Sequence, residues 1–513
     1  MKPRIPVAVL GFLLLLANSS YLYAFATPSL FYFANVALHV LLGAVLTVVL
    51  LLALRHHLRD GLFFTAAAPV LLVGAGFGFY IAVVGATRAH VPALHWHIGI
   101  AAAGAALLLL HLMGSGLAFG AGRPNPRFLA GFAVIVFAFP LALRWYEQSQ
   151  PPRDRIENPT SVALSMEGEG AGPKSPFFPS SAETNVGGII PSNFFMTSQA
   201  CGRCHKEIYK QWSSSAHHFS SFNNQWYRKS IEYMQDVQGT TQGSKWCAGC
   251  HDHAVFFNGR FERPIKEQIQ TPEAQAGLSC TSCHAIVHVK STMGQGDFTI
   301  EYPPLHDLAA SENEVAQWVH DRLLVMDPEP HKKTFIKSFH REQSPEFCAS
   351  CHKVHLDVPV NNYRWFRGFN EYDNWQASGV SGQGARSFYY PAKPMKCASC
   401  HMPLIEAEDP AATEGKVHSH RFPGANTALP HVNKDPVQLK VVQDFLRDGQ
   451  ISVDVFGLVR TAATATSKPA PGAPARNEPE LATSFAQGEE SGTLAGGAFL
   501  LPPAEVILSL IHI

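Results

Sequence analysis

The sequence predicts a mainly α-helical protein: an N-terminal bundle of about five transmembrane helices, an irregular helical domain, and the start of a β-rich segment at the C-terminus. Three observations carry this prediction. Long uncharged apolar runs fill residues 1–146. One cysteine motif recurs five times in the middle of the chain. The apolar run Phe499–Leu510 follows a Pro-rich stretch near the end and is typical of a β-strand.

Composition narrows the class of protein. The chain has 513 residues, of which 46% are hydrophobic and 16% are charged, below the roughly 25% charged residues of an average soluble domain. Lys+Arg and Asp+Glu balance at 40 each, so the formal net charge is zero. A dedicated nucleic-acid binder would carry a basic patch or a high pI. The balance argues against nucleic acid as a partner, and the low charge indicates membrane lipid.

The transmembrane module is predicted over residues 1–146. No charged residue occurs from Ile5 to Leu54, and Pro28 divides this run into two stretches. Each is long enough to cross a hydrocarbon core of about 30 Å at about 1.5 Å per residue. Three further uncharged stretches follow, and we expect Arg144 and Trp145 to anchor the end of the last one at the interface. The predicted spans are residues 6–27, 30–54, 62–85, 94–119 and 128–146.

Positive charge predicts the orientation of these spans. Basic residues precede the first span, follow the second and separate the fourth from the fifth: Lys2, Arg4, Arg55, Arg59, Arg123 and Arg127. The loops after the first and third spans hold only Arg88. By the positive-inside rule the N-terminus is cytoplasmic and everything after Arg144 lies outside. We therefore expect a bacterial inner (cytoplasmic) membrane protein with a periplasmic C-terminal part.

The first span has an alternative interpretation as a cleaved signal peptide. Met1–Ala26 has a basic start, an apolar run and the small-residue site Ala24-Phe25-Ala26. Cleavage would leave four spans and the same outward C-terminal part. We favour retention, because the next span starts almost at once.

Three histidines in the predicted spans are candidate haem ligands. Ionisable residues inside a membrane are costly and point to function. Neutral imidazole is also an axial ligand of haem iron. His39 and His97 are the preferred pair for a b-type haem, and His111, which lies on nearly the same helix face as His97, would serve a weaker second one. The alternative is histidines that hydrogen-bond between packed helices.

Two stretches are predicted to be linkers. Residues 147–199 are rich in Pro, Ser, Gly and Glu without sustained periodicity, although short packed pieces are expected around Phe177–Phe178 and Phe194–Phe195. Residues 461–490 include the sequence Lys-Pro-Ala-Pro-Gly-Ala-Pro and are expected to separate two domains. The domain between these linkers is predicted over residues 200–460.

Every cysteine belongs to the pattern Cys-x-x-Cys-His. The cysteines are Cys201, Cys204, Cys247, Cys250, Cys280, Cys283, Cys348, Cys351, Cys397 and Cys400, and the histidines are His205, His251, His284, His352 and His401. This is the attachment signature of c-type haem. Two thiols three positions apart can each add to one vinyl group of the same porphyrin. The adjacent imidazole then becomes the proximal ligand of the iron.

Zinc pairs, redox dithiols and structural disulfides are the alternative interpretations of paired cysteines. None of these chemistries requires a histidine directly after the second cysteine in all five motifs. All five motifs also follow Arg144, on the predicted outer side, where bacterial proteins receive c-type haem. The sequence therefore predicts five covalently bound haems.

Each iron has a sixth position, which a second histidine or a methionine could fill. Histidines close to the motifs are candidates for this distal position, whereas Met402 adjoins its own proximal histidine and cannot easily reach across that iron. The preferred distal candidates are His217, His288, His331, His355 and His420. His218, His340 and His418 belong to a wider set.

The region Ser198–Val455 resembles the multihaem c-type cytochromes related to the tetrahaem electron carrier of ammonia oxidation, to pentahaem nitrite reductase and to hydroxylamine oxidoreductase. The resemblance rests on CGRCHKEIYKQWSSSAH, EFCASCHKVHLD and KCASCHMPL followed by HSHRF. It implies a mostly helical, irregular fold with closely stacked haems, and distal roles for His217, His355 and His420, with His288 and His331 as weaker assignments. It covers about half of the chain.

One departure from that family bears on function. Its catalytic members use a lysine in place of a proximal histidine, or a tyrosine cross-link, whereas all five motifs here end in His. We therefore expect an electron carrier with no catalytic residue, which passes electrons from the quinone pool through redox partner proteins to an external acceptor. The alternatives are an oxidoreductase that reduces a small nitrogen or sulfur compound at an open haem, and a haem-based sensor.

The C-terminus is expected to be truncated. Residues 491–513 are predicted to start a β domain, and the last six, LSLIHI, resemble a translated sequencing adapter more than a natural terminus. We exclude those six residues from the fold prediction.

Overall fold

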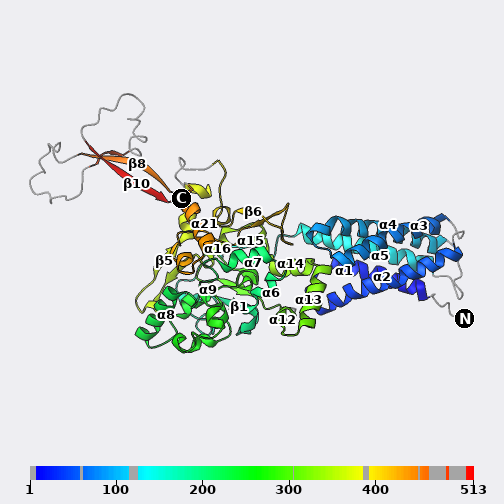
Figure 1. The fold of residues 1–513 in the computed structure, drawn as a ribbon, viewed down its shortest axis with the longest axis horizontal. Helices are drawn as coiled ribbons and strands as arrows, with labels where there is room; N and C mark the ends of the chain where they lie inside the picture. Colours follow the sequence, from blue (N-terminus) through cyan, green and yellow to red (C-terminus); the bar gives the residue numbers. More distant parts are fainter. Residues whose placement is uncertain are drawn as a thin grey trace, which may run out of the picture. The chain divides into compact units, whose positions relative to one another are not determined.

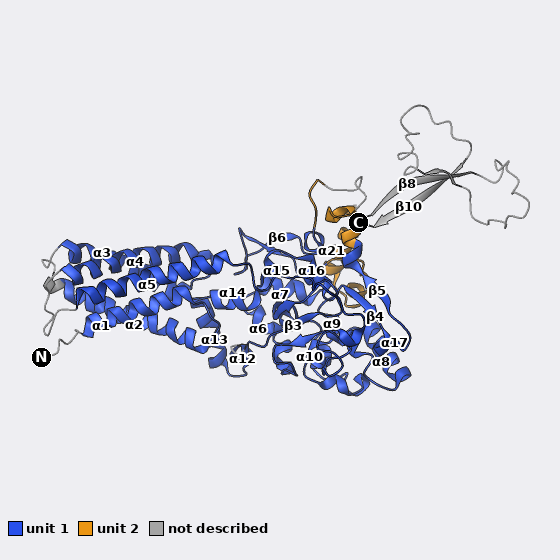
Figure 2. Ribbon diagram, turned by 180° about the vertical axis from the view of Figure 1, so that it is seen from behind, with its two compact units in different colours: residues 1–374, 396–422 blue, residues 375–395, 423–513 orange. Residues whose placement is uncertain are grey.

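The structure is a computed structural model that describes residues 7–57, 62–114, 125–303, 306–384, 392–448, 451–460, 481–484 and 504–512. It divides the chain into two compact units (Figure 2). The first unit comprises Met1–Asn374 and Lys396–Phe422, and the second comprises Trp375–Met395 and Pro423–Ile513. The predicted fold class is confirmed: the chain is mainly helical, with five membrane-length helices at the N-terminus and a few short strands.

Five long helices form the N-terminal bundle, in which they run side by side (Figure 1). They are α1 (Val7–Ala24), α2 (Leu30–His57), α3 (Leu62–Val84), α4 (Val91–Gly114) and α5 (Pro126–Ser149). All five are long and apolar enough to cross a membrane. Their bounds follow the predicted spans to within a few residues. Asn125 caps α5 by accepting a hydrogen bond from the Arg127 amide, and Pro126 occupies the first turn, where its missing N–H costs nothing.

Small residues bring α3 and α4 together. A Cβ on Gly74 would lie 3.1 Å from the Ala101 amide nitrogen, and one on Gly104 would lie 2.8 Å from Cγ of Leu71. Glycine at these positions lets two helix backbones approach closely, the usual device of membrane helices. This close pairing fixes how α4 presents its histidines.

The cysteine-rich part of the chain is built from short helices. They are α6 (Ser198–Gly202), α7 (Lys206–Ser213), α8 (Gln225–Gln238), α9 (Lys245–His251), α10 (His253–Phe256), α11 (Cys280–His284), α12 (His306–Ala310), α13 (Glu314–Met326), α14 (Glu329–Phe335), α15 (Ser338–Arg341), α16 (Pro345–Ala349), α17 (Val358–Asn361), α18 (Glu371–Ala377), α19 (Cys397–His401), α20 (Ala428–Val432) and α21 (Pro436–Arg447). The 3-10 turns are η1 (Arg88–His90), η2 (Met166–Gly168), η3 (Ser192–Met196), η4 (Arg260–Glu262), η5 (Ile265–Glu267), η6 (Glu273–Gln275) and η7 (Gly379–Ser381).

Strands in the first unit are short and form small sheets. β1 (Glu183–Thr184) pairs in parallel with β3 (Phe298–Ile300), which pairs antiparallel with β2 (Ile286–Val289). β4 (Lys353–Leu356) and β5 (Phe366–Asn370) form one antiparallel pair, and β6 (Leu404–Glu406) and β7 (Lys416–His418) form another.

The second unit contains a three-stranded antiparallel sheet in the order β10-β8-β9, with β8 (Ile451–Arg460), β9 (Leu481–Ser484) and β10 (Ala504–His512). The sequence prediction gave β8 to the preceding domain and placed β9 in a linker. In the structure β8 pairs instead with both of the other strands. Residues 461–480, which make up most of that predicted linker, and residues 485–503 lie outside the described residues.

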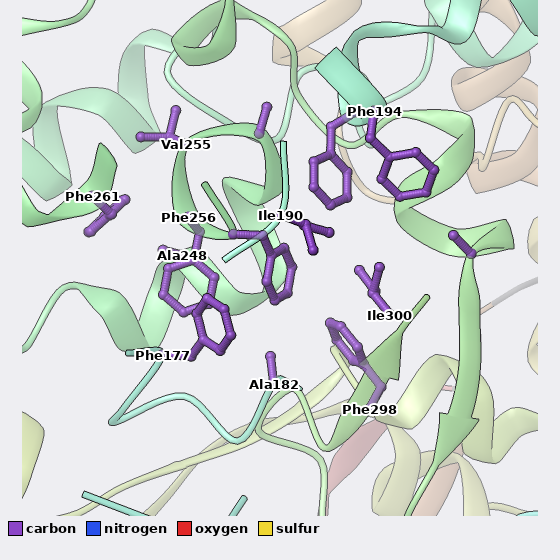
Figure 3. Packing of buried hydrophobic residues seen from close by; sticks show 14 of the residues in the cluster. Phe177, Ala182, Ile190, Phe194, Ala248, Val255, Phe256, Phe261, Phe298 and Ile300 are labelled. Carbon is purple, nitrogen blue, oxygen red and sulfur yellow. The ribbon is translucent and has the colours of Figure 1, made fainter. Parts of the chain in front are cut away.

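The cysteine-rich region has an aromatic core (Figure 3), and Cys247 and Cys351 pack against it. Phe194, Phe195 and Phe257 are almost fully buried in it, and Phe195 and Phe257 stack with ring centroids 5.7 Å apart. Ala248 of α9 and Phe298 of β3 fill the same cluster. This packing holds α9, which contains the second motif, and the sheet of β2 and β3, which follows the third motif.

Part of the predicted linker 147–199 belongs to this core. Met166, Phe177 and Phe194 are almost fully buried, and β1 extends a sheet. The prediction of packed pieces near the phenylalanines therefore understated the packing. The segment has no helical or strand periodicity, so its burial depends on the surface that the rest of the domain offers.

The bundle and the cysteine-rich region meet at α13. Leu323, Leu324 and Met326 of α13 pack against Tyr32 and Phe33 at the start of α2. The Tyr32 hydroxyl donates a 2.5 Å hydrogen bond to Asp327 Oδ2.

A second contact of the junction lies at the end of α3. There the Ala86 amide donates to the Val325 carbonyl at 2.9 Å. Gly85 has a φ of +90°, and a Cβ there would overlap Val325, so only glycine fits this approach.

Candidate functional site

Each Cys-x-x-Cys-His motif lies at a short helical turn. α9, α11 and α19 contain their whole motifs, whereas α6 and α16 begin theirs. Positions three apart on a helix share a face, so the two thiols of a motif project together. In α11, Ser279 caps the helix by accepting from the Ser282 amide, while Thr281 and Ser282 are buried. The local sequence thus fixes the turn that pairs the thiols.

All ten cysteines are free; nine are partly buried and Cys204 is exposed. Burial raises the pKa of Cys247 and of Cys283 to about 12. A reactive redox dithiol needs the opposite, a lowered pKa that yields thiolate. Among the described residues, no three His, Cys, Asp or Glu side chains converge as they would to hold a metal ion directly. The described residues therefore do not favour zinc. Three thiols do have a lowered pKa, each first through the thiol of another motif: Cys280, to about 7, Cys351 and Cys397.

Thiols of different motifs touch one another. The side chains of Cys201 and Cys280 are hydrogen-bonded, as are those of Cys250 and Cys351 and those of Cys348 and Cys397. The first motif thus adjoins the third, and the fourth adjoins both the second and the fifth. Cys283 of the third motif also lies close enough to Cys351 of the fourth for the two thiols to interact through their charges, and this links the two groups of motifs into one cluster within the first unit.

Three motif histidines are oriented through Nδ1. His205 Nδ1 lies 2.8 Å from Oδ1 of the buried Asp409, His251 Nδ1 lies 2.9 Å from the Ser220 carbonyl oxygen, and His284 Nδ1 lies 3.0 Å from the Phe335 carbonyl oxygen. An Nδ1–H that donates to oxygen leaves Nε2 with its lone pair, as metal-binding histidines require. Sequence reasoning missed Asp409, because nothing in its neighbourhood signals this contact.

Three motif histidines have a second imidazole nearby. The ring centroids of His205 and His331 are 6.4 Å apart with planes inclined by 13°. Those of His284 and His420 are 6.3 Å apart at 25°.

The third such pair is formed by His352 and His217, whose ring centroids are 6.1 Å apart at 88°. Imidazoles that bind opposite faces of one metal at about 2 Å would have centroids roughly 6 Å apart. All three pairs match this spacing, so the structure brings the distal candidates His217, His331 and His420 to motif histidines.

His217 lies at the centre of the cluster. It is buried, and its Nδ1 has no hydrogen-bond partner in the described part of the chain. Burial, followed by the neighbouring rings of His352, His251, His420 and His401, lowers the pKa of His217 to about 3. The imidazole is therefore neutral, which is the form that ligates iron. This environment is also where the structure places the fifth motif histidine, His401.

His340 also lies beside a motif histidine, but its Nδ1 accepts a 3.1 Å hydrogen bond from the Lys337 amide, which leaves the ring proton on Nε2. Its ring centroid is 5.0 Å from that of His284, and its buried Nε2 has no hydrogen-bond partner among the described residues. Burial lowers its pKa to about 2. Sequence reasoning placed His340 only in the wider set, since its spacing from the motifs carries no signal.

Two preferred distal candidates lie elsewhere. His355 Nε2 is 2.8 Å from Oε1 of Glu169, and both side chains are buried. His288 is exposed on β2. In the described region neither ring contacts a motif histidine. In His355 the nitrogen that would bind iron is taken by a carboxylate, which adjacency to a motif in sequence could not reveal.

The structure also shows the neighbours of the three histidines in the membrane-spanning helices. The ring centroids of His39 in α2 and His97 in α4 are 6.0 Å apart with perpendicular planes. His111, in the last turn of α4, instead lies against Phe64, with ring centroids 5.5 Å apart. The structure thus brings together the preferred pair and separates His111 from it.

Comparison with known proteins gives one family. Residues 200–285, which include the first three motifs, match the family model described as cytochrome c554 and c-prime. No curated protein and no solved structure matches the chain. The match supports a c-type cytochrome, with covalently bound haem that serves electron transfer. The five apolar helices, taken with this match, suggest a membrane-anchored protein.

The residues present fit c-type haem. Free cysteine pairs face the same way, the adjacent imidazoles present Nε2, and second imidazoles stand at the spacing of axial ligands. This combination is what covalent attachment and two-sided ligation of one iron need.

Proposed function

We propose that this chain is a membrane-anchored electron carrier with five c-type haems, each bound through one cysteine pair and its adjacent histidine. The observation that carries the proposal is the common spacing of three imidazole pairs, 6.1 to 6.4 Å, each with one ring from a motif. Bound haem supplies reversible one-electron exchange at iron, and the protein sets ligation and spacing.

The distal ligands in this proposal are His331 opposite His205, His420 opposite His284, and His217 opposite His352. Ligation by two histidines gives a low-spin carrier of low potential. The thiol contacts between motifs support short distances between successive haems, because each cysteine would hold the edge of its own porphyrin. Short edge-to-edge distances suit relay of single electrons.

The orientation across the membrane is part of the proposal. The contacts at Tyr32 and Ala86 join the cysteine-rich region to the start of α2 and the end of α3. In sequence, basic residues stand at the other helix ends: Arg59 after α2, Arg123 before α5 and Arg127 in the first turn of α5. The positive-inside rule assigns those ends to the cytoplasm. This supports a periplasmic haem region that carries electrons from the quinone pool to an external acceptor.

The test is a haem count on the purified full-length chain. Intact mass and pyridine haemochrome spectra should give five covalent haems per chain. Fewer than three would contradict the proposal, as would zinc bound by the cysteines.

The distal assignments have a separate test. His331→Ala should convert one low-spin haem to high spin in electron resonance spectra, whereas the matched change His288→Ala, at an exposed histidine, should not. A spectrum unchanged by His331→Ala would remove that ligand assignment.

A second candidate function is reduction of a small nitrogen or sulfur compound at an open haem. His251 favours it, since its ring contact in the described structure is with Tyr227, at 4.5 Å and 15°, and no imidazole faces it at axial spacing. A high-spin signal in the unaltered protein that disappears when nitrite is added would support a reductase. If all haems are low-spin, the reductase function is rejected and electron transfer remains as the proposed function.

A further inference from the structure

The membrane bundle contains an imidazole pair with the geometry of the haem region. His39 comes from α2 and His97 from α4, and their ring centroids are 6.0 Å apart with planes at 90°. The three pairs that involve a motif histidine span 6.1 to 6.4 Å. The centroid distance of the membrane pair is therefore close to the distances of the three pairs in the cysteine-rich region.

Both membrane imidazoles are held through Nδ1. His97 Nδ1 lies 2.8 Å from the Gly74 carbonyl oxygen, which can only accept. His39 Nδ1 lies 3.3 Å from Ser19 Oγ, whose own hydroxyl donates to the Leu15 carbonyl at 2.7 Å. Ser19 Oγ therefore accepts from His39. Each ring thus has its proton on Nδ1 and its lone pair on Nε2, the arrangement seen when a second partner orients a metal-binding histidine.

A direct contact between the two rings does not explain their placement. No hydrogen bond joins His39 to His97 in the described structure, and a centroid separation of 6.0 Å leaves room for one atom between the nitrogens. A bare metal ion would need further protein ligands. In the described residues no third His, Cys, Asp or Glu joins this pair. Two opposed ligands complete the coordination of a metal only when a macrocycle supplies the rest.

Two glycines lie next to the pair, one on α2 and one on α3. Gly43 is one helical turn beyond His39, and a Cβ there would meet nothing within 4 Å. Gly78 faces the His97 ring so closely that a Cβ would lie 2.8 Å from Cε1. The first leaves space beside His39, and the second lets His97 lie against the α3 backbone.

We propose that α2 and α4 hold one non-covalent, b-type haem with His39 and His97 as its axial ligands. The site lies about 14 Å along α2 from Leu30 and about 9 Å along α4 from Val91, at about 1.5 Å per residue. Both helix starts belong to the end of the bundle that contacts α13. This inference deepens the proposed electron-transfer function, because it gives electrons in the membrane an entry point beside the c-type haems.

Extraction with acidified acetone distinguishes the two kinds of haem, because it removes non-covalent haem and leaves thioether-bound haem on the protein. The full-length chain, purified from membranes, should release one haem per chain with a b-type pyridine haemochrome spectrum. His39→Ala and His97→Ala should each lose this haem and retain the covalent ones. His95→Ala, at an exposed histidine of the same helix α4, is the matched control and should release as much haem as the unaltered chain.

The retained covalent haems report that each variant folds and inserts, so a misfolded variant is recognised. No extractable haem from a chain with covalent haems would overturn this inference and leave the proposed function intact. A lack of covalent haem would instead refute the proposed function. Release of haem from both histidine variants at the level of the control would also overturn the inference.

A second measurement does not depend on a substitution. Perpendicular imidazole planes give a strongly anisotropic low-spin ferric signal in electron resonance. Both the His39–His97 pair and the His217–His352 pair have such planes, so extraction of the non-covalent haem should remove one of two such contributions to the signal. If the signal of the unaltered chain survives unchanged in His97→Ala, the ligand assignment is wrong.

Discussion

The membrane bundle and the cysteine-rich region belong to one compact unit but reach their folds differently. The bundle helices run from 18 to 28 residues, whereas the helices that carry or begin the motifs have 5 to 7. A long apolar helix satisfies its own backbone groups in lipid. A helix of one or two turns is marginal alone and depends on tertiary packing. The comparison teaches that apolar composition is enough to form the helices of the bundle. The short helices of the cysteine-rich region form only with the support of the aromatic core and of bound ligands.

The largest expected effect comes from the fourth motif. Cys348 and Cys351 contact thiols of two other motifs, Cys397 and Cys250. Replacing both with alanine should remove one haem and, because two neighbours lose their contact, lower the amount of folded chain in membranes several-fold. Haem staining and intact mass would measure both results.

The matched control is Cys397→Ala with Cys400→Ala, since among the described residues that pair has a hydrogen bond to the thiol of one other motif, Cys348. It should lose one haem and keep four. Equal yields for the two variants would mean that contacts between motifs do not hold the region together.

Truncating a buried residue in each region sharpens the comparison. Phe257→Ala, in the aromatic core, should lower the free energy of unfolding by about 3–5 kcal/mol through lost burial and a cavity. Leu109→Ala, equally buried in the bundle, should cost less, because lipid is as apolar as leucine and only packing is lost. Denaturant titrations followed by near-UV circular dichroism would measure both, and equal losses would break the distinction.

Asp409 tests how the core orients a ligand. Asp409→Asn keeps the size of the side chain but removes the carboxylate at His205 Nδ1. Second partners of this kind are worth about 10–100-fold in ligand affinity, so one haem should rise in reduction potential by about 60–120 mV. Spectroelectrochemical titration would measure the shift. Asp444→Asn, in an exposed ion pair with Lys440, is the control and should leave all potentials in place.

The smallest expected effect concerns the junction between the two regions. Burial raises the pKa of Asp327 above its ordinary value of 3.8. The folded state therefore binds this proton more tightly than the unfolded chain, so the junction is most stable below pH 3.8 and loses stability as pH rises to the folded value.

Asp327→Asn should abolish this pH dependence, because the amide that replaces the carboxyl group does not titrate. Tyr32→Phe should extend it to higher pH, because it removes the hydroxyl that stabilises the charged carboxylate. Protease release of the cysteine-rich region at a series of pH values would measure both. A dependence that survives in Asp327→Asn would assign it to another group.

Some of the site was predictable because its signal is local. Cys-x-x-Cys-His places two thiols and an imidazole by spacing alone, so each motif could be recognised without its surroundings. The proposed distal position is different, since its candidate ligands come from other parts of the chain. His331, His420 and His217 reach motif histidines, whereas His355, next to a motif in sequence, turns to Glu169.

By itself the sequence determined the five apolar helices, the ten paired cysteines and their five histidines, because each depends on composition or spacing within one turn or one span. Only the tertiary structure decided which imidazoles oppose one another, that Asp409 orients His205, that Tyr32 meets Asp327, and that the supposed linker fills the core. These are contacts between residues far apart in the chain, and their geometry exists only after packing has selected one arrangement of the segments.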